Sequence, residues 1–195
     1  MLFMPLQGGG MEIFMKGLYK KSAALLGYHA LYSVVSLVFL LPFSNFIYYN
    51  DGVVKPLGGI LYTLVILLFY LSNLYSNIWH LGRAHSRKIS EIKPNPIYAL
   101  EISLISEIPT YIIFVFMIIF HLKNPNSFNI FYTIFKFWQG IYIGVLDISK
   151  IFYVISLILP IIFSLLGYIA GTKNFEFADK YIYPLIFKNK NKNKS

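Results

Sequence analysis

Cysteine is absent from this chain of 195 residues, and charged residues are scarce, at 13% of the total. The absence of cysteine excludes disulfides, thiolate metal sites and a thiol nucleophile. Soluble domains are about a quarter charged and about half apolar, whereas 57% of this chain is hydrophobic. Apolar runs of about 20 residues recur along it, which is typical of membrane-spanning helices. The composition therefore predicts an integral membrane protein with one compact membrane domain.

Common enzyme signatures are also absent from the sequence. It contains no His-Glu-x-x-His zinc motif, no Gly-x-Ser-x-Gly nucleophile motif, no phosphate-binding loop and no dinucleotide-binding fingerprint. The closest pair of histidines, His80 and His85, has a spacing that does not align two side chains on one helix face. We therefore expect a protein that is not an enzyme and binds neither a metal nor a cofactor.

Four apolar segments have the length of a membrane span. They are Ala23–Leu41, Leu57–Trp79, Ile102–Phe120 and Ile151–Ala170. As a helix, the first of them rises roughly 28 Å, which is enough to cross the hydrocarbon layer. Pro42 is expected to end the first helix, Pro96 suits the first position of a helix that leads into the third span, and Pro160 predicts a kink in the fourth.

A fifth apolar stretch, Phe128–Leu146, also contains Lys136 and Gln139. A lysine at the centre of a bilayer costs about 2.5–3.5 kcal/mol, so we expect this stretch to be an interfacial or re-entrant helix on the outer face. Trp138 and Tyr142 are then predicted to lie near the lipid head groups. The predicted fold class is all-α: a bundle of four transmembrane helices plus this extra helix.

The positive charges predict which side of the membrane each loop faces. The chain carries 17 Lys and Arg and 8 Asp and Glu, a net charge of +9. Three basic residues precede the first span, four lie between the second and third, and six follow the fourth, so 13 of the 17 face the cytoplasm if the N-terminus does. The protein is therefore expected in a cell membrane with both termini cytoplasmic. Its basic inner surface is predicted to contact anionic head groups and not nucleic acid.

The two ends of the chain are predicted to lie outside the membrane domain. Gln7–Met11 can be encoded by a purine-rich ribosome-binding sequence followed by a start codon, so residues 1–10 are interpreted as a mis-called leader and Met11 as the start. The alternative is a flexible Gly-rich leader. Residues 11–187 are expected to form the four-span domain, and residues 188–195 a disordered basic tail.

Short motifs flank the second and third predicted spans. Trp79–Arg83 reads Trp-His-Leu-Gly-Arg, Lys93–Pro96 reads Lys-Pro-Asn-Pro, and the third span carries Glu107–Pro109, Glu-Ile-Pro. These motifs resemble those of small uncharacterised multi-pass membrane proteins of Gram-positive bacteria, which carry a Trp–Gly–Arg element after the second span and a proline at the start of the third. The resemblance covers residues 20–185 and implies a multi-pass fold, without an activity.

Polar side chains of three predicted spans gather at a similar depth. His29 and Glu107 each lie fewer than two helical turns from the cytoplasmic end of their span, roughly 8–9 Å deep at 1.5 Å per residue. Asn73 and Asn77, four residues apart, share a face at the inner end of the second span, and Ser103 is four residues before Glu107. The candidate cluster is therefore His29, Asn73, Asn77, Ser103 and Glu107.

Two interpretations of this cluster stay open. An ionisable group inside a span is a functional hypothesis by default, and here it predicts a cytoplasm-open vestibule where Glu107 binds a proton or cation beside His29. The structural alternative is interhelical hydrogen bonding, at about 0.6 kcal/mol per bond, or a carboxylate close enough to the interface to reach water.

Two functions follow from these interpretations. The first is a non-enzymatic subunit, assembly factor or immunity-type partner of a larger membrane complex, which the small size, missing motifs and basic inner surface favour. The alternative is a small homo-oligomeric transporter or channel built around Glu107. The genes beside this one would distinguish them, because a neighbouring transporter ATPase or peptide precursor indicates the partner function.

Two smaller patterns make local predictions. Gly140-x-x-x-Gly144 and Gly167-x-x-x-Gly171 allow close backbone approach and are expected to pack within the bundle. Asp147 follows the fifth apolar stretch and is expected to form a local ion pair at the outer surface with a nearby lysine, Lys150.

Overall fold

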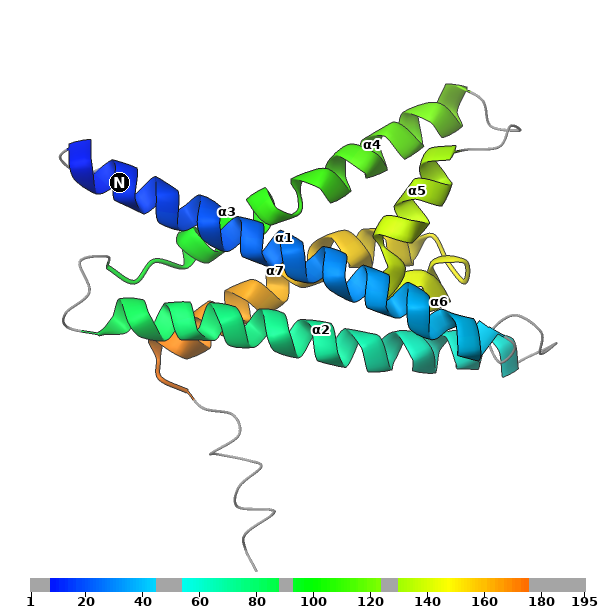
Figure 1. Cartoon of the computed structure of the whole chain (residues 1–195), viewed down its shortest axis with the longest axis horizontal. Helices are drawn as coiled ribbons and strands as arrows, with labels where there is room; N and C mark the ends of the chain where they lie inside the picture. Colours follow the sequence, from blue (N-terminus) through cyan, green and yellow to red (C-terminus); the bar gives the residue numbers. More distant parts are fainter. Residues whose placement is uncertain (1–7, 45–53, 88–92, 124–129, 176–195) are drawn as a thin grey trace, which may run out of the picture.

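The computed structural model describes residues 8–44, 54–87, 93–123 and 130–175, and every regular element among them is helical (Figure 1). The three long helices are α1 (Gly8–Ser44), α2 (Val54–Ser86) and α7 (Ile151–Thr172). The shorter elements are α3 (Pro96–Ser106), α4 (Ile108–Lys123), α5 (Ile130–Trp138), the 3-10 turn η2 (Gly140–Tyr142) and α6 (Ile143–Leu146). Most of the predicted leader and all of the predicted tail lie outside the described residues, so both stay predictions.

Within the described parts of the chain, three helices, α1, α2 and α7, are long and apolar enough to cross a membrane. A fourth span exists if α3 and α4, which meet at a bend of 52°, are counted as one. The first, second and fourth predicted spans each lie inside one of the long helices, which begin earlier or end later than predicted. The all-helical class is confirmed for the described residues, and the long apolar helices indicate a membrane-embedded protein.

The third predicted span, Ile102–Phe120, is not one continuous helix. Glu107 separates α3 from α4, with φ −93° and ψ 3° at its backbone. Pro109 explains the break. It has no N–H to donate to the carbonyl of Ile105, four residues earlier, and its ring would clash with that carbonyl in a continuous helix. The break therefore falls beside the acidic residue that the sequence singles out.

Two other prolines lie at helix ends, one at the start of α3 and one in the last turn of α1. Pro96 is the first residue of α3, and the side chain of Asn95 caps this helix by accepting a hydrogen bond from the N–H of Ile97, so the predicted start is confirmed. Pro42 was expected to end the first helix, but α1 continues to Ser44. A proline in the last turn removes only one intrahelical hydrogen bond, which two further residues tolerate.

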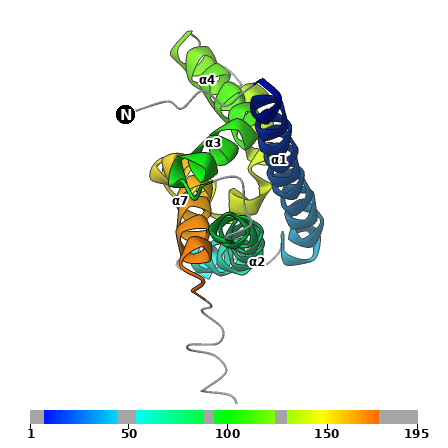
Figure 2. The ribbon, with the colours of Figure 1, turned by 90° about the vertical axis from the view of Figure 1, so that its left-hand side faces the viewer.

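The helices form a splayed bundle. α2 and α7 pack against each other in parallel orientation, and α1 lies on another side of the bundle (Figure 1). Figure 2, a view from one end, shows α3 between α1 and α7, with α4 leaning away from the bundle. α5 returns beside α4 and leads into η2 and α6, which pack against α1 and α2.

The segment from α5 to α6 enters the bundle, and two glycines make this possible. A Cβ atom on Gly140 would lie 2.6 Å from the carbonyl oxygen of Ser33 in α1, and one on Gly144 would lie 2.4 Å from that of Gly59 in α2. Only glycine allows backbones to approach this closely. The turn is therefore wedged between two long helices.

This insertion corrects the predicted positions of Trp138 and Tyr142. Tyr142 is 1% exposed and belongs to the core, and Trp138 stacks on the ring of His29. Both side chains therefore contact protein where contact with lipid head groups was expected. The reason is the glycine-mediated insertion of η2, which carries both residues inward.

The second glycine motif joins α7 to α2. A Cβ on Gly167 would lie 2.7 Å from the carbonyl oxygen of Tyr75, and one on Gly171 would lie 2.1 Å from that of Trp79. Both motifs therefore pack within the chain, as the sequence predicts.

At the far end of α5, an exposed ion pair joins Asp147 to Lys136, whose Nζ is 2.6 Å from the carboxylate. Sequence spacing predicts Lys150 as the partner, and the structure gives Lys136 instead, because α5 and α6 fold back on each other around η2. The hydroxyl of Tyr132 also donates to Asp147, at 2.6 Å. Burial, together with hydrogen bonds to Asp147 and Tyr153, raises the pKa of Tyr132.

Candidate functional site

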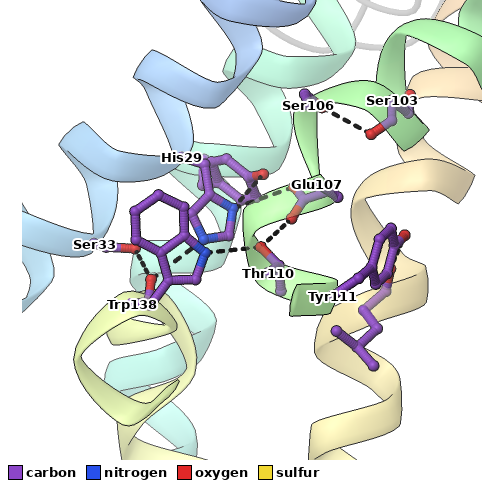
Figure 3. Close-up of polar contacts among 10 residues, drawn as sticks. His29, Ser33, Ser103, Ser106, Glu107, Thr110, Tyr111 and Trp138 are labelled. Atoms are coloured by element: carbon purple, nitrogen blue, oxygen red, sulfur yellow. Dashed lines mark hydrogen bonds and ion pairs between the residues drawn. The ribbon is translucent and has the colours of Figure 1, made fainter. Parts of the chain in front are cut away.

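The structure brings together two of the five predicted polar residues, His29 and Glu107 (Figure 3). Nδ1 of His29 lies 3.2 Å from Oε1 of Glu107, and the two side chains are 1% and 3% exposed. His29 is the central residue of Met15–Phe43, the apolar segment of α1. The pair is therefore enclosed by protein inside the bundle.

Glu107 reaches His29 because it sits between two helices. Its N–H donates to the carbonyl of Ser103, and its carbonyl accepts from the N–H of Tyr111, so its backbone groups remain bonded across the bend. Figure 3 shows the side chain at the junction of α3 and α4, directed toward the imidazole in α1. The pair thus links α1 to the break in the bent helix.

Thr110 and Trp138 hold the other oxygen of the carboxyl group. The indole Nε1 of Trp138 donates to Oγ1 of Thr110 at 2.8 Å, and the Thr110 hydroxyl donates to Oε2 of Glu107 at 2.7 Å. The indole can only donate, so the threonine hydroxyl must accept from it and donate onward. Oε2 of Glu107 is therefore an acceptor.

The second ring nitrogen of His29 meets a backbone carbonyl. Nε2 lies 3.3 Å from the carbonyl oxygen of Trp138, and the Ser33 hydroxyl donates to the same oxygen at 2.6 Å. A carbonyl oxygen only accepts, so we assign a proton to Nε2. The rings of His29 and Trp138 stack at 5.3 Å between centroids, which fixes the orientation of the imidazole.

Tyr70 closes the site from α2. Its hydroxyl is 3.4 Å from Nδ1 of His29, and the two rings make an edge contact at 5.8 Å. Tyr70 is 1% exposed, so this face of the pair is also shielded from solvent. Side chains from α1, α2, α4 and α5 thus surround Glu107.

These assignments leave one mobile proton between His29 and Glu107. It lies either on Nδ1, which gives an ion pair, or on Oε1, which gives a neutral acid beside a neutral imidazole. Both arrangements keep the pair neutral overall. With a further proton, both Nδ1 of His29 and Oε1 of Glu107 would be donors that face each other. Without the shared proton, both atoms would be acceptors that face each other. The contact therefore requires one shared proton.

The side chains of the other three predicted residues form hydrogen bonds elsewhere and not with the carboxyl group of Glu107. The amide of Asn77 donates to the side chain of Asn73 at 2.7 Å, and that of Asn73 donates to the hydroxyl of Tyr32 at 3.5 Å. The hydroxyl of Ser103 donates to the carbonyl of Ala99, within its own helix. These side chains satisfy one another or the local backbone, and so lie beside the site rather than in it.

Sequence reasoning missed Tyr70, Thr110 and Trp138. Thr110 is three residues after Glu107 on the same helical face, and this spacing was a usable signal. Tyr70 lies one turn before Asn73, but a tyrosine in an apolar helix has no distinctive pattern. Trp138 reaches the site only through tertiary insertion of η2.

Comparison with known proteins adds no relative to this picture. No family model matches the chain, and no match was found among curated proteins or solved structures. The resemblance of Trp79–Arg83 and Glu107–Pro109 to small membrane proteins of Gram-positive bacteria therefore stays a prediction.

Proposed function

We propose that this chain is a proton-coupled membrane transporter in which Glu107 and His29 form the coupling site. The observation that carries the proposal is an enclosed acid–base pair at a helix break, in the middle of apolar helices. Ionisable groups in such a position are costly and mark proton relays and ion paths. Discontinuous helices also form the central sites of many secondary transporters.

Hydrogen bonding alone does not account for a carboxyl group here. A glutamine at position 107 could accept from Thr110 and donate to Nδ1 of His29, so it would reproduce both hydrogen bonds without an ionisable group. What glutamine cannot do is exchange a proton. The proposal assigns that exchange to Glu107.

The proposed coupling follows from the requirement for one shared proton. When Glu107 and His29 together gain or lose a proton, their contact is no longer favourable, and the hydrogen bond that joins α1 to the α3–α4 junction is lost. That junction already departs from a continuous helix by 52°, so it is the natural hinge. Proton binding is thereby converted into a movement of α4 relative to α3.

The proposal includes a membrane topology. α3 and α4 form one bent span, α5 to α6 is a re-entrant segment from the outer face, and both termini are cytoplasmic in a bacterial cell membrane. The distribution of 13 of the 17 basic residues supports this orientation. The burial of Phe135, Gln139 and Tyr142 favours a re-entrant segment over an interfacial helix.

Proton binding is tested by infrared difference spectroscopy on proteoliposomes during a pH jump. We expect a band from a protonated carboxyl group that disappears in Glu107→Gln and persists in Glu101→Gln, an exposed residue in the same bent span. Transport is tested by an internal pH dye while sugars, amino acids and alkali cations are added singly. A solute-dependent pH change should be lost in Glu107→Gln. A carboxyl band that survives Glu107→Gln would refute the coupling site.

A second candidate function is a non-enzymatic subunit, assembly factor or immunity-type partner of a larger membrane complex. A groove of about 830 Å³ between α1 and α2 favours it, with Phe39 and Leu61 among its apolar lining residues. Phe39 is 53% exposed and Leu61 57%, so the groove opens to the surroundings of the bundle. Photo-crosslinking from Phe39, with Ile158 on α7 as the control position, should give a protein adduct only at Phe39. Lipid adducts alone at both positions would contradict this function.

A further inference from the structure

Two side chains of the re-entrant segment carry buried polar atoms that have no hydrogen-bond partner among the described residues. They are the amide oxygen and nitrogen of Gln139 and the hydroxyl of Tyr142. Gln139 is 0% and Tyr142 1% exposed. Buried polar groups are almost always bonded to protein, water or an ion, so these atoms point to a bound molecule.

The two side chains share one side of the η2 turn, beside Glu107. The N–H of Tyr142 donates to the carbonyl of Gln139 at 2.8 Å, and side chains three residues apart in a 3-10 turn are eclipsed. Tyr142 also lies close enough to Glu107 and Tyr70 for electrostatic interaction with both. The start of this turn lies beside the proposed coupling site, because Trp138, the residue before Gln139, forms hydrogen bonds with both His29 and Thr110.

The chemistry of these atoms identifies the class of ligand. A cation would satisfy the two oxygens but would face the amide N–H₂ of Gln139, which only donates. Water both donates and accepts, and a buried water requires two to four polar partners, as a rule about three. Gln139 and Tyr142 together supply three such polar atoms, whereas the isolated buried hydroxyl of Ser164 supplies one.

The polar side chains on the two sides of Glu107 differ in their hydrogen bonding. On the α3 side, the hydroxyl of Ser103 donates to Ala99 and that of Ser106 to the carbonyl of Ser103. Both serine hydroxyls therefore donate their hydrogen bonds within α3. The unpartnered atoms belong instead to η2, whose flanking helices lead to the exposed pair Lys136–Asp147.

We infer that Gln139 and Tyr142 hold buried water against Glu107, and that this water carries protons between Glu107 and the outer face. The inference rests on the proposed function and adds the route that protons take. Gln139 and Tyr142 are then positioning residues for water, and Tyr142 also relays a proton through its hydroxyl.

The route is tested by the rate at which the carboxyl band of Glu107 shifts when proteoliposomes are transferred to D₂O. We expect Tyr142→Phe and Gln139→Leu to keep the band but slow its exchange at least tenfold, and Ser164→Ala to exchange like the wild type. Thermal unfolding is a second readout, since Tyr142→Phe should lower the melting temperature if its hydroxyl binds water. A rise on removal of the hydroxyl would show a dry site and overturn the inference.

Access from the outer face is tested by a pH jump outside sealed vesicles. Glu107 should respond faster in right-side-out than in inverted vesicles, and the opposite order would refute the outward route. Different results would refute the inference and the proposed function. If no carboxyl band depends on Glu107, the proposed function is wrong, whereas a Glu107 band with wild-type exchange in both Tyr142→Phe and Gln139→Leu refutes only the water route.

Discussion

Replacing Thr110 by valine tests whether the hydrogen-bond network around Glu107 is as the structure describes. The substitution keeps the shape of the side chain and removes only the hydroxyl, which accepts from Trp138 and donates to Glu107. Thr110 is 0% exposed, so no solvent replaces the lost bonds. Trp138 Nε1 and Glu107 Oε2 would both be left without this partner.

The cost can be worked out from the number of groups left unpaired. A buried donor or acceptor without a partner costs about 1–3 kcal/mol, so two such groups predict about 2–6 kcal/mol. Interhelical hydrogen bonds in membrane proteins average only about 0.6 kcal/mol, which sets a floor of about 1.2 kcal/mol for two. The higher range should apply at Thr110, because one partner is a carboxyl group in a closed site.

Thr63→Val is the matched control. Thr63 is 2% exposed in α2, and its hydroxyl has no hydrogen-bond partner among the described residues. Like that of Ser164, this is a single buried hydroxyl without the further polar partners that a buried water requires. The same change of atoms should therefore leave the stability unchanged or raise it slightly. Any general effect of valine in a helix is common to both variants.

The assay is thermal unfolding in detergent, followed by tryptophan fluorescence. At roughly 2–4 °C per kcal/mol for a chain of this size, Thr110→Val should lower the melting temperature by at least about 4 °C. Equal shifts in Thr110→Val and Thr63→Val, or no shift in Thr110→Val, would refute the assigned network.

Three further predictions concern other parts of the fold. Gly171→Ala should destabilise by about 1–3 kcal/mol through overpacking against α2, whereas Gly27→Ala, with no atom near its added Cβ, should be neutral or stabilising; equal melting temperatures would refute the close α2–α7 contact. Tyr168→Phe should cost about 1–3 kcal/mol for each group left unpaired, because the hydroxyl joins His85 to the loop before α3, and an unchanged melting temperature would contradict this. A reporter fused after Ser195 should be active only if it works in the cytoplasm, and activity of a reporter that works outside would mean a different number of spans.

The long helices were predictable because their signal is local. A run of apolar residues long enough to span the hydrocarbon layer predicts a helix whatever surrounds it, and this holds for α1, α2 and α7. Pro96 was equally predictable as a helix start, since proline at the first position of a helix loses no hydrogen bond. Helix ends were less predictable, and α1 begins well before the predicted Ala23 because its lysines are compatible with a helix.

The site was only partly predictable because its partners meet through tertiary contacts. Glu107 and His29 stood out as ionisable residues in apolar segments, and a hydropathy pattern is enough to find them. Asn73 and Asn77 stood out as polar residues in an apolar segment, but their side chains form a hydrogen bond with each other along one helix. Trp138 arrives only because Gly140 packs closely against α1, which no local pattern of residues can show.

The neutrality of the pair explains how an acid can lie among apolar helices and still respond to protons. Whether the shared proton is on Glu107 or on His29, the net charge inside the bundle is the same, so neither arrangement adds the cost of an isolated buried charge. Gain or loss of one proton changes that charge and, in the same step, places two donors or two acceptors face to face. In the proposed function, the charge change and the loss of the link between α1 and the hinge at Glu107 are therefore one event. Arginine in place of His29 could hold the same helices together, but it stays protonated and could not share a proton with Glu107.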